Sequence, residues 1–440
     1  MKKVFIKTYG CQMNVYDSER IVESLSKAGI KETKNVDDSD VVVFNTCHIR
    51  EKASEKLYSD IGRLKKFKGP KKVIVSGCVA QAENKEILKR SPDVDLVIGP
   101  QAYHRIPDYL DEIKNNQKVV ETEFLIHDKF KKLNKRSKFI KKPTAFLTIQ
   151  EGCDKFCTFC VVPYTRGAEY SRTTNEIIDE AKQLIDRGVK EITLLGQNVN
   201  AFHGKNSYGA TINLGELIFQ LSEISGLERL RYTTNHPRDV NQTLIDAHRE
   251  VKILMPYMHL PIQSGSNKVL KLMNRRHTAE EYIKIIDNIR NARSDIAISS
   301  DFISGFPGET DKDFEDTLDI IKKINYAQSY SFIFSARPGT PASEMSAQVP
   351  NNIKSQRLKI MQEILKAQQF RFNKKFMNKE VSILIERAGK EKDQLIGKSP
   401  HSQSVYIQNP KLKIGDTIRV LIKSVKTNSL YGEFVEGTKS

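Results

Sequence analysis

Short apolar runs alternate with amphipathic stretches through the first 125 residues of the chain. Strands are predicted near 3–8, 41–45, 73–77 and 94–98, and intervening segments such as 16–29 have the periodicity of helices. Strands that alternate with helices in this way predict a small parallel α/β domain.

The same alternation resumes at residue 144 and continues to about residue 335. Strand–helix units joined by short loops predict a barrel or part of a barrel, with its active site at the carboxyl ends of the strands. A long basic helix is predicted to follow at 352–376. The strands of this region are predicted at 144–150, 191–196, 230–234, 258–262, 297–303 and 330–335.

The pattern changes after residue 377, where polar turns separate short predicted strands: VSILIER, QSVYIQ, DTIRVLIKSV and LYGEFVE. These predict a small β-barrel of a class often used to bind RNA. The predicted fold class is therefore α/β: an N-terminal small parallel α/β domain at 1–125, a partial (β/α)6 barrel at 144–376 and a small β-barrel at 377–440. A basic linker at 126–143 joins the first two domains.

The charge of the chain narrows the class of partner. Lys and Arg number 71 against 54 Asp and Glu, a formal net charge of +17, which indicates a polyanionic partner such as nucleic acid. General solubility charge is the alternative. The segment 129–142 is rich in Lys and Arg and has no acid, so it is either a solvated linker or a strap that contacts phosphates. With no long apolar run and no signal peptide, a cytoplasmic protein without a membrane contact is expected.

Three of the six cysteines, Cys11, Cys47 and Cys78, are dispersed, and each follows an apolar strand. The carboxyl ends of parallel strands gather on one edge of a sheet, so these thiols are expected to converge. The alternative is three separate buried cysteines that act as small hydrophobic residues. A disulfide framework is disfavoured because the chain is long and lacks an export signal.

The other three cysteines, Cys153, Cys157 and Cys160, form C-x3-C-x2-C just after the first predicted barrel strand. Thiolates at this spacing can bind three irons of one [4Fe–4S] cluster, which normally has four cysteine ligands. The fourth iron would then remain open. Zinc is the less favoured alternative, because no fourth Cys or His lies nearby to complete a tetrahedron.

The loop GCDKFCTFCVVPYTRG (152–167) resembles the cluster loop of radical S-adenosylmethionine enzymes. Together with the segments around the dispersed cysteines, it makes the whole chain similar to the methylthiotransferase family, which has a three-cysteine N-terminal domain, a radical SAM barrel and a C-terminal TRAM domain. Further stretches resemble the branch of this family that modifies N6-isopentenyladenosine in tRNA. The segments that carry the resemblance are YGCQMN (9–14), NTCHIREKASEK (45–56), SGCVAQ (76–81), RYTTNHP (231–237), LPIQSGSNKVLKLMNRRHTAEEY (260–282), SSDFISGFPGET (299–310) and SFIFSARPGTPA (331–342).

The resemblance implies insertion of a methylthio group at C2 of N6-isopentenyladenosine at position 37 of tRNA. An aromatic C–H has no leaving group and is not usefully acidic, so acid–base catalysis is insufficient and a cofactor must supply a radical route. By resemblance, the cluster held by Cys153, Cys157 and Cys160 cleaves S-adenosylmethionine to make the radical. A second [4Fe–4S] cluster on Cys11, Cys47 and Cys78 would present sulfur, which a further S-adenosylmethionine methylates.

Other residues are expected from the same resemblance to contact S-adenosylmethionine. One lies in the cluster loop and would touch the adenine, three follow the second barrel strand where the family binds the amino group, and three follow later strands near the ribose and adenine. A structural role in a capped or turned loop is an equal alternative for the polar ones. These residues are Phe159, Gly196, Gln197, Asn198, Gln263, Ser264 and Gly305.

The partner implied by the resemblance is tRNA, through an anticodon loop in which a base is unstacked at low cost. An electron donor such as flavodoxin or ferredoxin and a sulfur source are also expected. Candidate phosphate contacts are the C-terminal domain and the segments 129–142 and 352–376. The alternatives within the family are methylthiolation of threonylcarbamoyladenosine-37 in tRNA or of a ribosomal-protein aspartate. An alternative of another class is a non-catalytic iron–sulfur protein that binds RNA.

Overall fold

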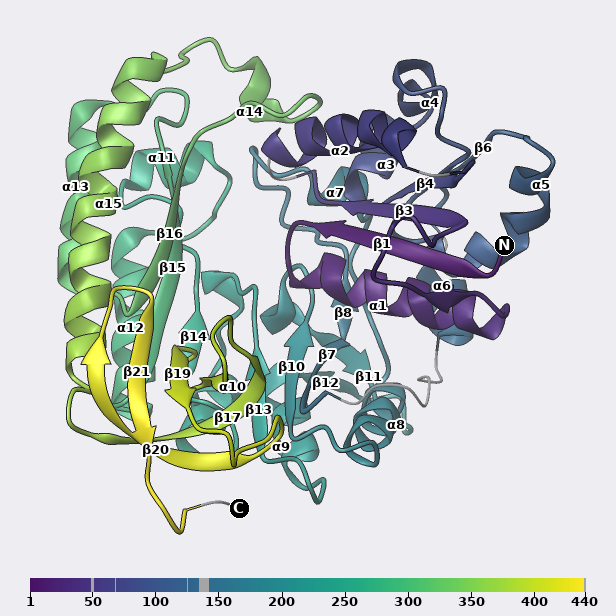
Figure 1. Cartoon of the computed structure of the whole chain (residues 1–440). Coiled ribbons are helices and arrows are strands. Elements are labelled where there is room, and N and C mark those ends of the chain that lie inside the picture. Colours follow the sequence, from purple (N-terminus) through teal and green to yellow (C-terminus); the bar gives the residue numbers. More distant parts are fainter. Residues whose placement is uncertain (49–50, 68, 125, 134–141, 439–440) are drawn as a thin grey trace.

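The computed structural model covers the whole chain and describes all residues except 49–50, 68, 125, 134–141 and 439–440 (Figure 1). Its N-terminal part is a six-stranded parallel sheet with the order β2-β1-β3-β4-β5-β6. The strands are β1 (Lys3–Tyr9), β2 (Lys31–Glu32), β3 (Val41–Thr46), β4 (Lys72–Ser76), β5 (Leu96–Ile98) and β6 (Val119–Glu121). The helices are α1 (Gln12–Lys27), α2 (Glu51–Arg63), α3 (Cys78–Glu83), α4 (Glu86–Arg90), α5 (Leu110–Lys114) and α6 (Ile126–Lys132), with 3-10 turns η1 (Leu64–Lys66) and η2 (Tyr103–Tyr109).

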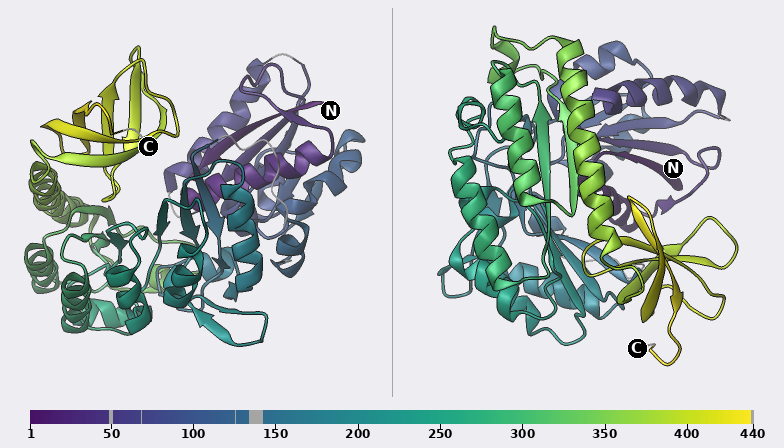
Figure 2. Two further views of the ribbon diagram at one scale, coloured as in Figure 1. Left: turned by 90° about the horizontal axis from the view of Figure 1, so that it is seen from below. Right: turned by 90° about the vertical axis from the view of Figure 1, so that its left-hand side faces the viewer.

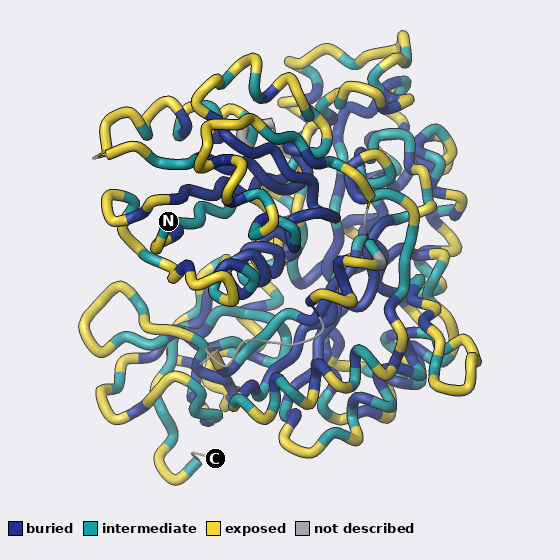
Figure 3. Tube along the Cα trace, turned by 90° about the vertical axis from the view of Figure 1, so that its right-hand side faces the viewer, coloured by how far each residue is buried: buried dark blue, intermediate teal, exposed yellow. Residues whose placement is uncertain are grey.

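The central strands of this sheet are buried on both faces. Val41 and Val43 of β3 pack into a core on one side, and Val42 and Phe44 pack into a second core on the other. A strand covered on both faces has an unbroken apolar sequence, which explains the run at 41–44. In Figure 3 the trace through these strands is buried, while the loops around them are exposed.

The central part is a partial barrel made of two parallel three-stranded sheets, in the orders β13-β10-β7 and β14-β15-β16. Backbone hydrogen bonds from Leu230 to Ile253 and from Met255 to Leu230 join the two halves. The strands are β7 (Thr144–Thr148), β10 (Glu191–Leu195), β13 (Arg229–Tyr232), β14 (Tyr257–His259), β15 (Ala297–Ser304) and β16 (Gln328–Ile333). The main helices are α8 (Thr174–Ile185), α9 (Leu214–Ser222), α10 (Gln242–Glu250), α11 (Asn267–Leu272), α12 (Ala279–Ala292), α13 (Asp311–Ile324) and α15 (Asn351–Lys374).

One continuous core joins the outer faces of both half-barrels to the surrounding helices. The inner face of the β7 half has a different partner, because Phe146 and Leu195 pack against Met13 and Tyr16 of α1. The N-terminal domain therefore lies against the barrel through the helix that begins just after Cys11, as Figure 1 shows.

The C-terminal part is a closed five-stranded barrel, β17-β18-β19-β21-β20, which packs against one side of the larger barrel (Figure 2). Arg231 on the inner face of β13 donates to the carbonyl oxygens of Ser399 and Pro400, both at 2.8 Å. Arg229 donates to the Lys398 carbonyl at 2.8 Å. The strands are β17 (Glu380–Ala388), β18 (Gln394–Lys398), β19 (Ser404–Gln408), β20 (Thr417–Val425) and β21 (Ser429–Phe434).

The predicted α/β fold class with a C-terminal barrel is confirmed, while the exact domain boundaries stay predictions. The strand β18 was missed, because its sequence QLIGK ends in glycine and lysine and resembles the turns beside it. Part of the basic segment 129–142 was also misread: Lys129 is fully buried on α6 and forms an ion pair with Glu151. Residues 134–141 lie outside the described part of the chain. Within the described residues, no helix is both long and apolar enough to cross a membrane.

Candidate active site

Cys11, Cys47 and Cys78 lie at the carboxyl ends of three adjacent parallel strands. The backbone pairs Tyr9 with Thr46 between β1 and β3, and Asn45 with Ser76 between β3 and β4, so the strands end at nearly the same level. Cys11 caps α1, Cys47 directly follows β3, and Cys78 begins α3. The Cys47 nitrogen donates to the Tyr9 carbonyl at 3.1 Å, which fixes the first two loops to each other.

A glycine precedes two of these cysteines, and in both places the backbone requires it. Gly10 and Gly77 have φ values of +125° and +89°, a region that side chains disfavour. A Cβ at Gly10 would lie 2.3 Å from the Cβ of Cys47, and one at Gly77 would lie 2.6 Å from the Thr46 carbonyl oxygen. The close approach of the three loops therefore depends on these two glycines.

A second group forms in the loop between β7 and α8. The short antiparallel strands β8 (Gln150–Glu151) and β9 (Tyr170–Ser171) close the base of this loop, and the Cys153 nitrogen donates to the Gly167 carbonyl at 3.3 Å. The Cys160 nitrogen donates to the Cys157 carbonyl at 2.9 Å, so Cys153, Cys157 and Cys160 share one tight turn. Arg275, from the segment after α11, donates to the Cys157 sulfur at 3.6 Å.

The donor chemistry of both groups fits iron–sulfur clusters. All six cysteines are free thiols. Burial raises the pKa of Cys153 to about 11, and burial with the neighbouring charge of Cys157 raises that of Cys160 to about 12. A hydrogen bond with Cys47 lowers the pKa of Cys11 to about 6. The thiols of Cys153 and Cys160 resist ionisation, and coordination to a metal deprotonates such thiols, which removes this conflict.

Among the described residues, no three or more His, Cys, Asp or Glu side chains form a group that could hold a metal ion. This finding leaves the cluster reading in place, because each thiolate of a cubane binds a different iron and the sulfurs need not meet at one point.

Buried charges connect the two cysteine groups. Arg166, on the returning side of the second loop, donates to Asp17 of α1 at 2.6 Å and lies 3.6 Å from Glu151. Lys129 of α6 pairs with the same Glu151 and is fully buried. Four charged side chains thus meet at the boundary between the N-terminal sheet and the barrel, beside both sets of thiols.

The segment Gly196–Asn198 after β10 is held by Gln150. The Gln150 side-chain oxygen accepts from the nitrogens of Gln197 and Asn198 at 2.9 and 3.2 Å, and a Cβ at Gly196 would lie 2.4 Å from it. Gln197 in turn accepts from the Gly152 nitrogen at 2.5 Å. Asn198 donates to Asp239 at 2.8 Å, so these three predicted residues lie directly beside the cluster loop.

The other four predicted contacts with S-adenosylmethionine differ in burial and in the residues they contact. Phe159 packs against an apolar group that includes Met273, Phe306 and Phe334. Gln263 has a φ of +78° and donates through its nitrogen to Asp301. Gly305 donates to Glu309 at 3.0 Å, and a Cβ there would collide with Lys354. Ser264 is fully buried and bonds to Thr317 at 3.2 Å, which favours its structural alternative.

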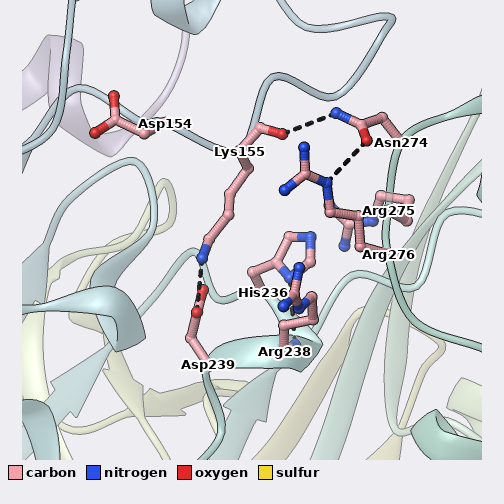
Figure 4. A pocket seen from close by; sticks show the side chains of 8 residues that line it. All are labelled: Asp154, Lys155, His236, Arg238, Asp239, Asn274, Arg275 and Arg276. Carbon is pink, nitrogen blue, oxygen red and sulfur yellow. Dashed lines mark hydrogen bonds and ion pairs between the residues drawn. The ribbon is translucent and has the colours of Figure 1, made fainter.

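A strongly charged pocket of about 180 Å³ lies beside the cluster loop (Figure 4). Lys155 crosses it to pair with Asp239 at 2.7 Å, and Asn274 holds the cluster-loop carbonyls of Lys155 and Phe156. His236 is buried, with its Nε2 left unpartnered, and burial lowers its pKa far below the ordinary value. The lining residues are Asp154, Lys155, His236, Arg238, Asp239, Asn274, Arg275 and Arg276.

Several of these residues were not found from the sequence alone. Gln150, Arg166 and Arg275 act through partners far away in the chain; Arg166 and its partner Asp17 are 149 residues apart. The sequence offers one signal by which some of them could be found, since polar residues adjoin the cysteines. Gln150 and Glu151 stand just before the loop, and the TRG sequence stands at its end.

Comparison with known proteins shows which family the chain belongs to. Protein-family models match three regions: an uncharacterized protein family, UPF0004, over residues 3–99, the radical SAM superfamily over 147–321, and the TRAM domain over 374–435. A tRNA-2-methylthio-N(6)-dimethylallyladenosine synthase from Agrobacterium fabrum is 54% identical over 98% of this chain and 97% of its own. The chain belongs to the tRNA methylthiotransferase family of radical SAM enzymes.

Solved structures show how far the methylthiotransferase shares its fold with other radical SAM enzymes. The methyltransferase TsrM from Kitasatospora setae, with tryptophan and a SAM analogue, has a TM-score of 0.58 at 12% identity, over 78% of this chain and 75% of that chain. The same enzyme with cobalamin and a [4Fe-4S] cluster has a TM-score of 0.55 at 12% identity, over 78% and 77%. At this identity the likeness concerns the fold alone.

Proposed function

We propose that this methylthiotransferase replaces the C2 hydrogen of N6-isopentenyladenosine at position 37 of tRNA by a methylthio group. One observation carries the proposal: Arg166, in the loop of Cys153, Cys157 and Cys160, reaches Asp17 of α1, the helix that Cys11 caps, in a chain closely similar to a relative that bears this activity in its name. Two incomplete donor sets side by side suit a reaction that needs one site for a radical and another for sulfur.

Cys153, Cys157 and Cys160 would hold the radical SAM [4Fe–4S] cluster, and Cys11, Cys47 and Cys78 a second one. When bound, the first cluster and S-adenosylmethionine would supply the radical that removes the C2 hydrogen, and the second cluster would present the sulfur. The β8–β9 ladder and the loops at Gly10 and Gly77 support this assignment of the thiols. Two N–H groups, from Arg275 and Val162, point at the sulfurs of Cys157 and Cys160 at 3.6 and 3.5 Å.

The charged pocket of Figure 4 suits the amino-acid end of S-adenosylmethionine. Its cations Arg238, Arg275 and Arg276 would face a carboxylate, while Asp239, which already orients Lys155 and Asn198, would face an ammonium group. Phe159, Gln263 and Gly305 remain proposed contacts for the rest of the molecule. For Ser264 we expect a supporting role, through its bond to Thr317.

The target base would reach the carboxyl ends of the barrel strands along the inner face of the β15–β16 half. Tyr330 and Phe332 pair with Asp301 and Ile303, which share that face, and the two aromatic residues are 45% and 44% exposed. Exposed aromatic rings stack on unstacked bases with little regard to sequence. The opposite half of the inner face is already covered by α1, so the β16 side is the one left for the substrate.

The C-terminal barrel and α15 would contact the phosphates of the tRNA. Two basic side chains of α15, Lys354 and Arg357, are buried and cannot reach a phosphate. Arg357 pairs with Glu309 and Asp311. Exposed cations remain along the same helix, at Lys359, Lys366, Arg371, Lys374 and Lys375. Binding should therefore weaken steeply as salt rises. An electron donor such as flavodoxin or ferredoxin, a sulfur source and a cytoplasmic location remain predictions.

Mass spectrometry of tRNA nucleosides from cells that lack this chain tests the proposal. The methylthio form of isopentenyladenosine should disappear while isopentenyladenosine itself accumulates, and the wild-type chain should restore it. Loss of the methylthio form of threonylcarbamoyladenosine instead would assign the chain to the other tRNA branch. Unchanged tRNA would contradict the proposal.

A further inference from the structure

Asp301 places a carboxylate on the inner face of the β15–β16 half of the barrel. It lies in the middle of β15, and Ser299 and Ile303, two residues before and after it, share its face. Phe302 lies on the opposite face and packs into the core between the barrel and its helices. Asp301 therefore points into the barrel, where 28% of its side chain is exposed.

A histidine from the neighbouring strand holds this carboxylate. His259, at the end of β14, pairs with Ser299 in the backbone register, and its Nδ1 lies 2.9 Å from the Ser299 hydroxyl. Its Nε2 lies 3.4 Å from Oδ2 of Asp301. When the serine hydroxyl donates to Nδ1, the ring has its proton on Nε2 and directs it toward the carboxylate. The two neighbours of His259 thus fix the ring, and the ring fixes one oxygen of Asp301.

An aromatic ring stands beside the same carboxylate. Tyr330 of β16 pairs with Asp301 in the backbone register, and its ring meets the edge of the His259 ring at a centroid distance of 6.2 Å. Figure 1 shows β16 and β14 on either side of β15. Tyr330 is exposed, so it offers a flat base a surface on which to stack. A base stacked there presents its edge to Asp301.

The chemistry of the carboxylate decides which atom of the base it can bind. A carboxylate only accepts hydrogen bonds, so it needs a donor. The ring nitrogens N1, N3 and N7 of adenine are acceptors, and a carboxylate repels them. An adenine with a single substituent on N6 keeps one N–H at that atom. This N6–H is the hydrogen-bond donor that the isopentenylated base offers to Asp301.

We propose that Asp301 binds the target base by accepting a hydrogen bond from N6–H while the base stacks on Tyr330, and that His259 is a positioning residue that acts through Asp301. The inference rests on the proposed function, because it takes N6-isopentenyladenosine as the base that enters the barrel. Hydrogen bonds to a charged acceptor are among the stronger ones, so a base without N6–H should bind about tenfold more weakly or worse. Asp301 thus recognises that N6 carries one substituent and not two.

The test compares two anticodon stem–loop RNAs that differ only at N6 of the target base. One carries N6-isopentenyladenosine, and the other carries its N6-methyl derivative, which keeps the isopentenyl group but has no N6–H. Dissociation constants are measured by fluorescence anisotropy with the reconstituted full-length protein and S-adenosylmethionine, without a reductant. The wild type should bind the N6-methyl RNA about tenfold more weakly or worse, and Asp301→Ala should bind the two RNAs nearly alike.

Two further variants separate the proposed contact from a general effect of charge or packing. Asp319→Ala removes an equal charge from the exposed outer surface of α13 and should keep the wild-type preference. His259→Gln should reduce the preference without abolishing it, because Asp301 remains but is less firmly held. A purely structural role for Asp301 or His259 would change both dissociation constants by the same factor and leave their ratio unchanged.

An Asp301→Ala protein that keeps the wild-type preference would overturn the inference, and so would a wild-type protein that binds both RNAs alike. If Asp301→Ala does not accumulate, Asp301→Asn decides in its place: it keeps the shape but not the charge, and an unchanged preference would again contradict the contact. A third RNA, with a 2′-deoxy target nucleotide, tests for a ribose contact. If Asp301→Ala loses discrimination against that RNA instead, Asp301 binds the ribose and the inference is wrong.

The readout is binding, so it is separate from the test of the proposed function. A wild-type protein that prefers the RNA with N6–H, yet leaves both RNAs unmodified when a reductant and sulfide are added, would contradict the proposed function alone.

Discussion

The side-chain amides of Asn14 and Asn45 hydrogen-bond to each other at 3.2 Å beneath the first cysteine group, and neither is exposed to solvent. Asn45 also donates to the Asn14 carbonyl and to Ser18, while Asn14 accepts from the nitrogen and the sulfur of Cys11. The pair thus joins the first turn of α1 to the end of β3. A buried polar network of this kind fixes where Cys11 stands relative to Cys47.

Replacing Asn45 by Ala should therefore loosen the first cysteine group. The change leaves Asn14 with unsatisfied buried groups, which costs about 1–3 kcal/mol in the free energy of unfolding. In a Cys157→Ala background we also expect less iron per chain, measured after anaerobic reconstitution. The exposed Gln117→Ala serves as a control, with a change within about 0.5 kcal/mol and normal iron. Equal iron in both variants would contradict this reading of the network.

Loss of one cysteine from each group should block a different step of the reaction. Cys157→Ala should abolish formation of 5′-deoxyadenosine, since it removes a ligand of the radical SAM cluster. Cys47→Ala should spare cleavage of S-adenosylmethionine but prevent sulfur insertion into the RNA. Chromatographic measurement of 5′-deoxyadenosine and of modified RNA in the same reactions checks both. If Cys157→Ala still cleaves S-adenosylmethionine, the assignment of the radical site is wrong.

Arg231→Met should detach the C-terminal barrel. This arginine binds the carbonyls of Ser399 and Pro400 and pairs with Glu191 at 2.9 Å, so its loss leaves a buried carboxylate without its partner. Such a break costs about 3–5 kcal/mol. Limited proteolysis should then cut faster between α15 and β17. Adding Glu191→Gln removes the unpaired charge and should slow the proteolysis again. If the double variant is cleaved as fast as Arg231→Met alone, the unpaired Glu191 is not the cause.

Stability should fall at mild acid because of His248. Burial lowers its pKa from 6.5 to about 3, and its Nε2 lies 2.6 Å from the Tyr232 hydroxyl. The unfolded chain takes up a proton as the pH falls through 6.5, whereas the folded chain does not. The stabilisation is thus fully present above pH 6.5 and is lost as the pH falls towards 3, by about 2 kcal/mol at pH 5.

Urea unfolding of the wild type and of His248→Gln at pH 7 and pH 5 checks this effect. The wild type should lose more stability between the two pH values than the variant, in which this proton uptake is absent. Equal losses in both proteins would show that His248 does not contribute.

The long apolar strands were predictable because their sequences carry their own periodicity. The run at 41–45 and the strands at 191–196 and 297–303 lie within one or two residues of β3, β10 and β15. The short strands β5 and β6 are set by their neighbours in the sheet, so only one of them was found. Local patterns are weakest where pairing, not propensity, decides the conformation.

The cysteines could be found from spacing and from their places after strands, because a thiol in a loop is conspicuous. Their supporting residues could not. Arg166, Gln150 and Arg275 act only through folding, which brings together segments that are distant along the chain. Ser264 shows the reverse: its place after a strand suggested a ligand contact, yet the fold buries its hydroxyl against Thr317.

The most direct test of the account is mass spectrometry of an isopentenylated anticodon stem–loop RNA after reaction with the reconstituted full-length protein. The reaction is run without oxygen, with S-adenosylmethionine, a reductant and sulfide. The account predicts that the C2 hydrogen of the isopentenyladenosine is replaced by a methylthio group, while 5′-deoxyadenosine forms in step. RNA that stays unmodified while S-adenosylmethionine is cleaved, or a methylthio group at another position, would contradict it.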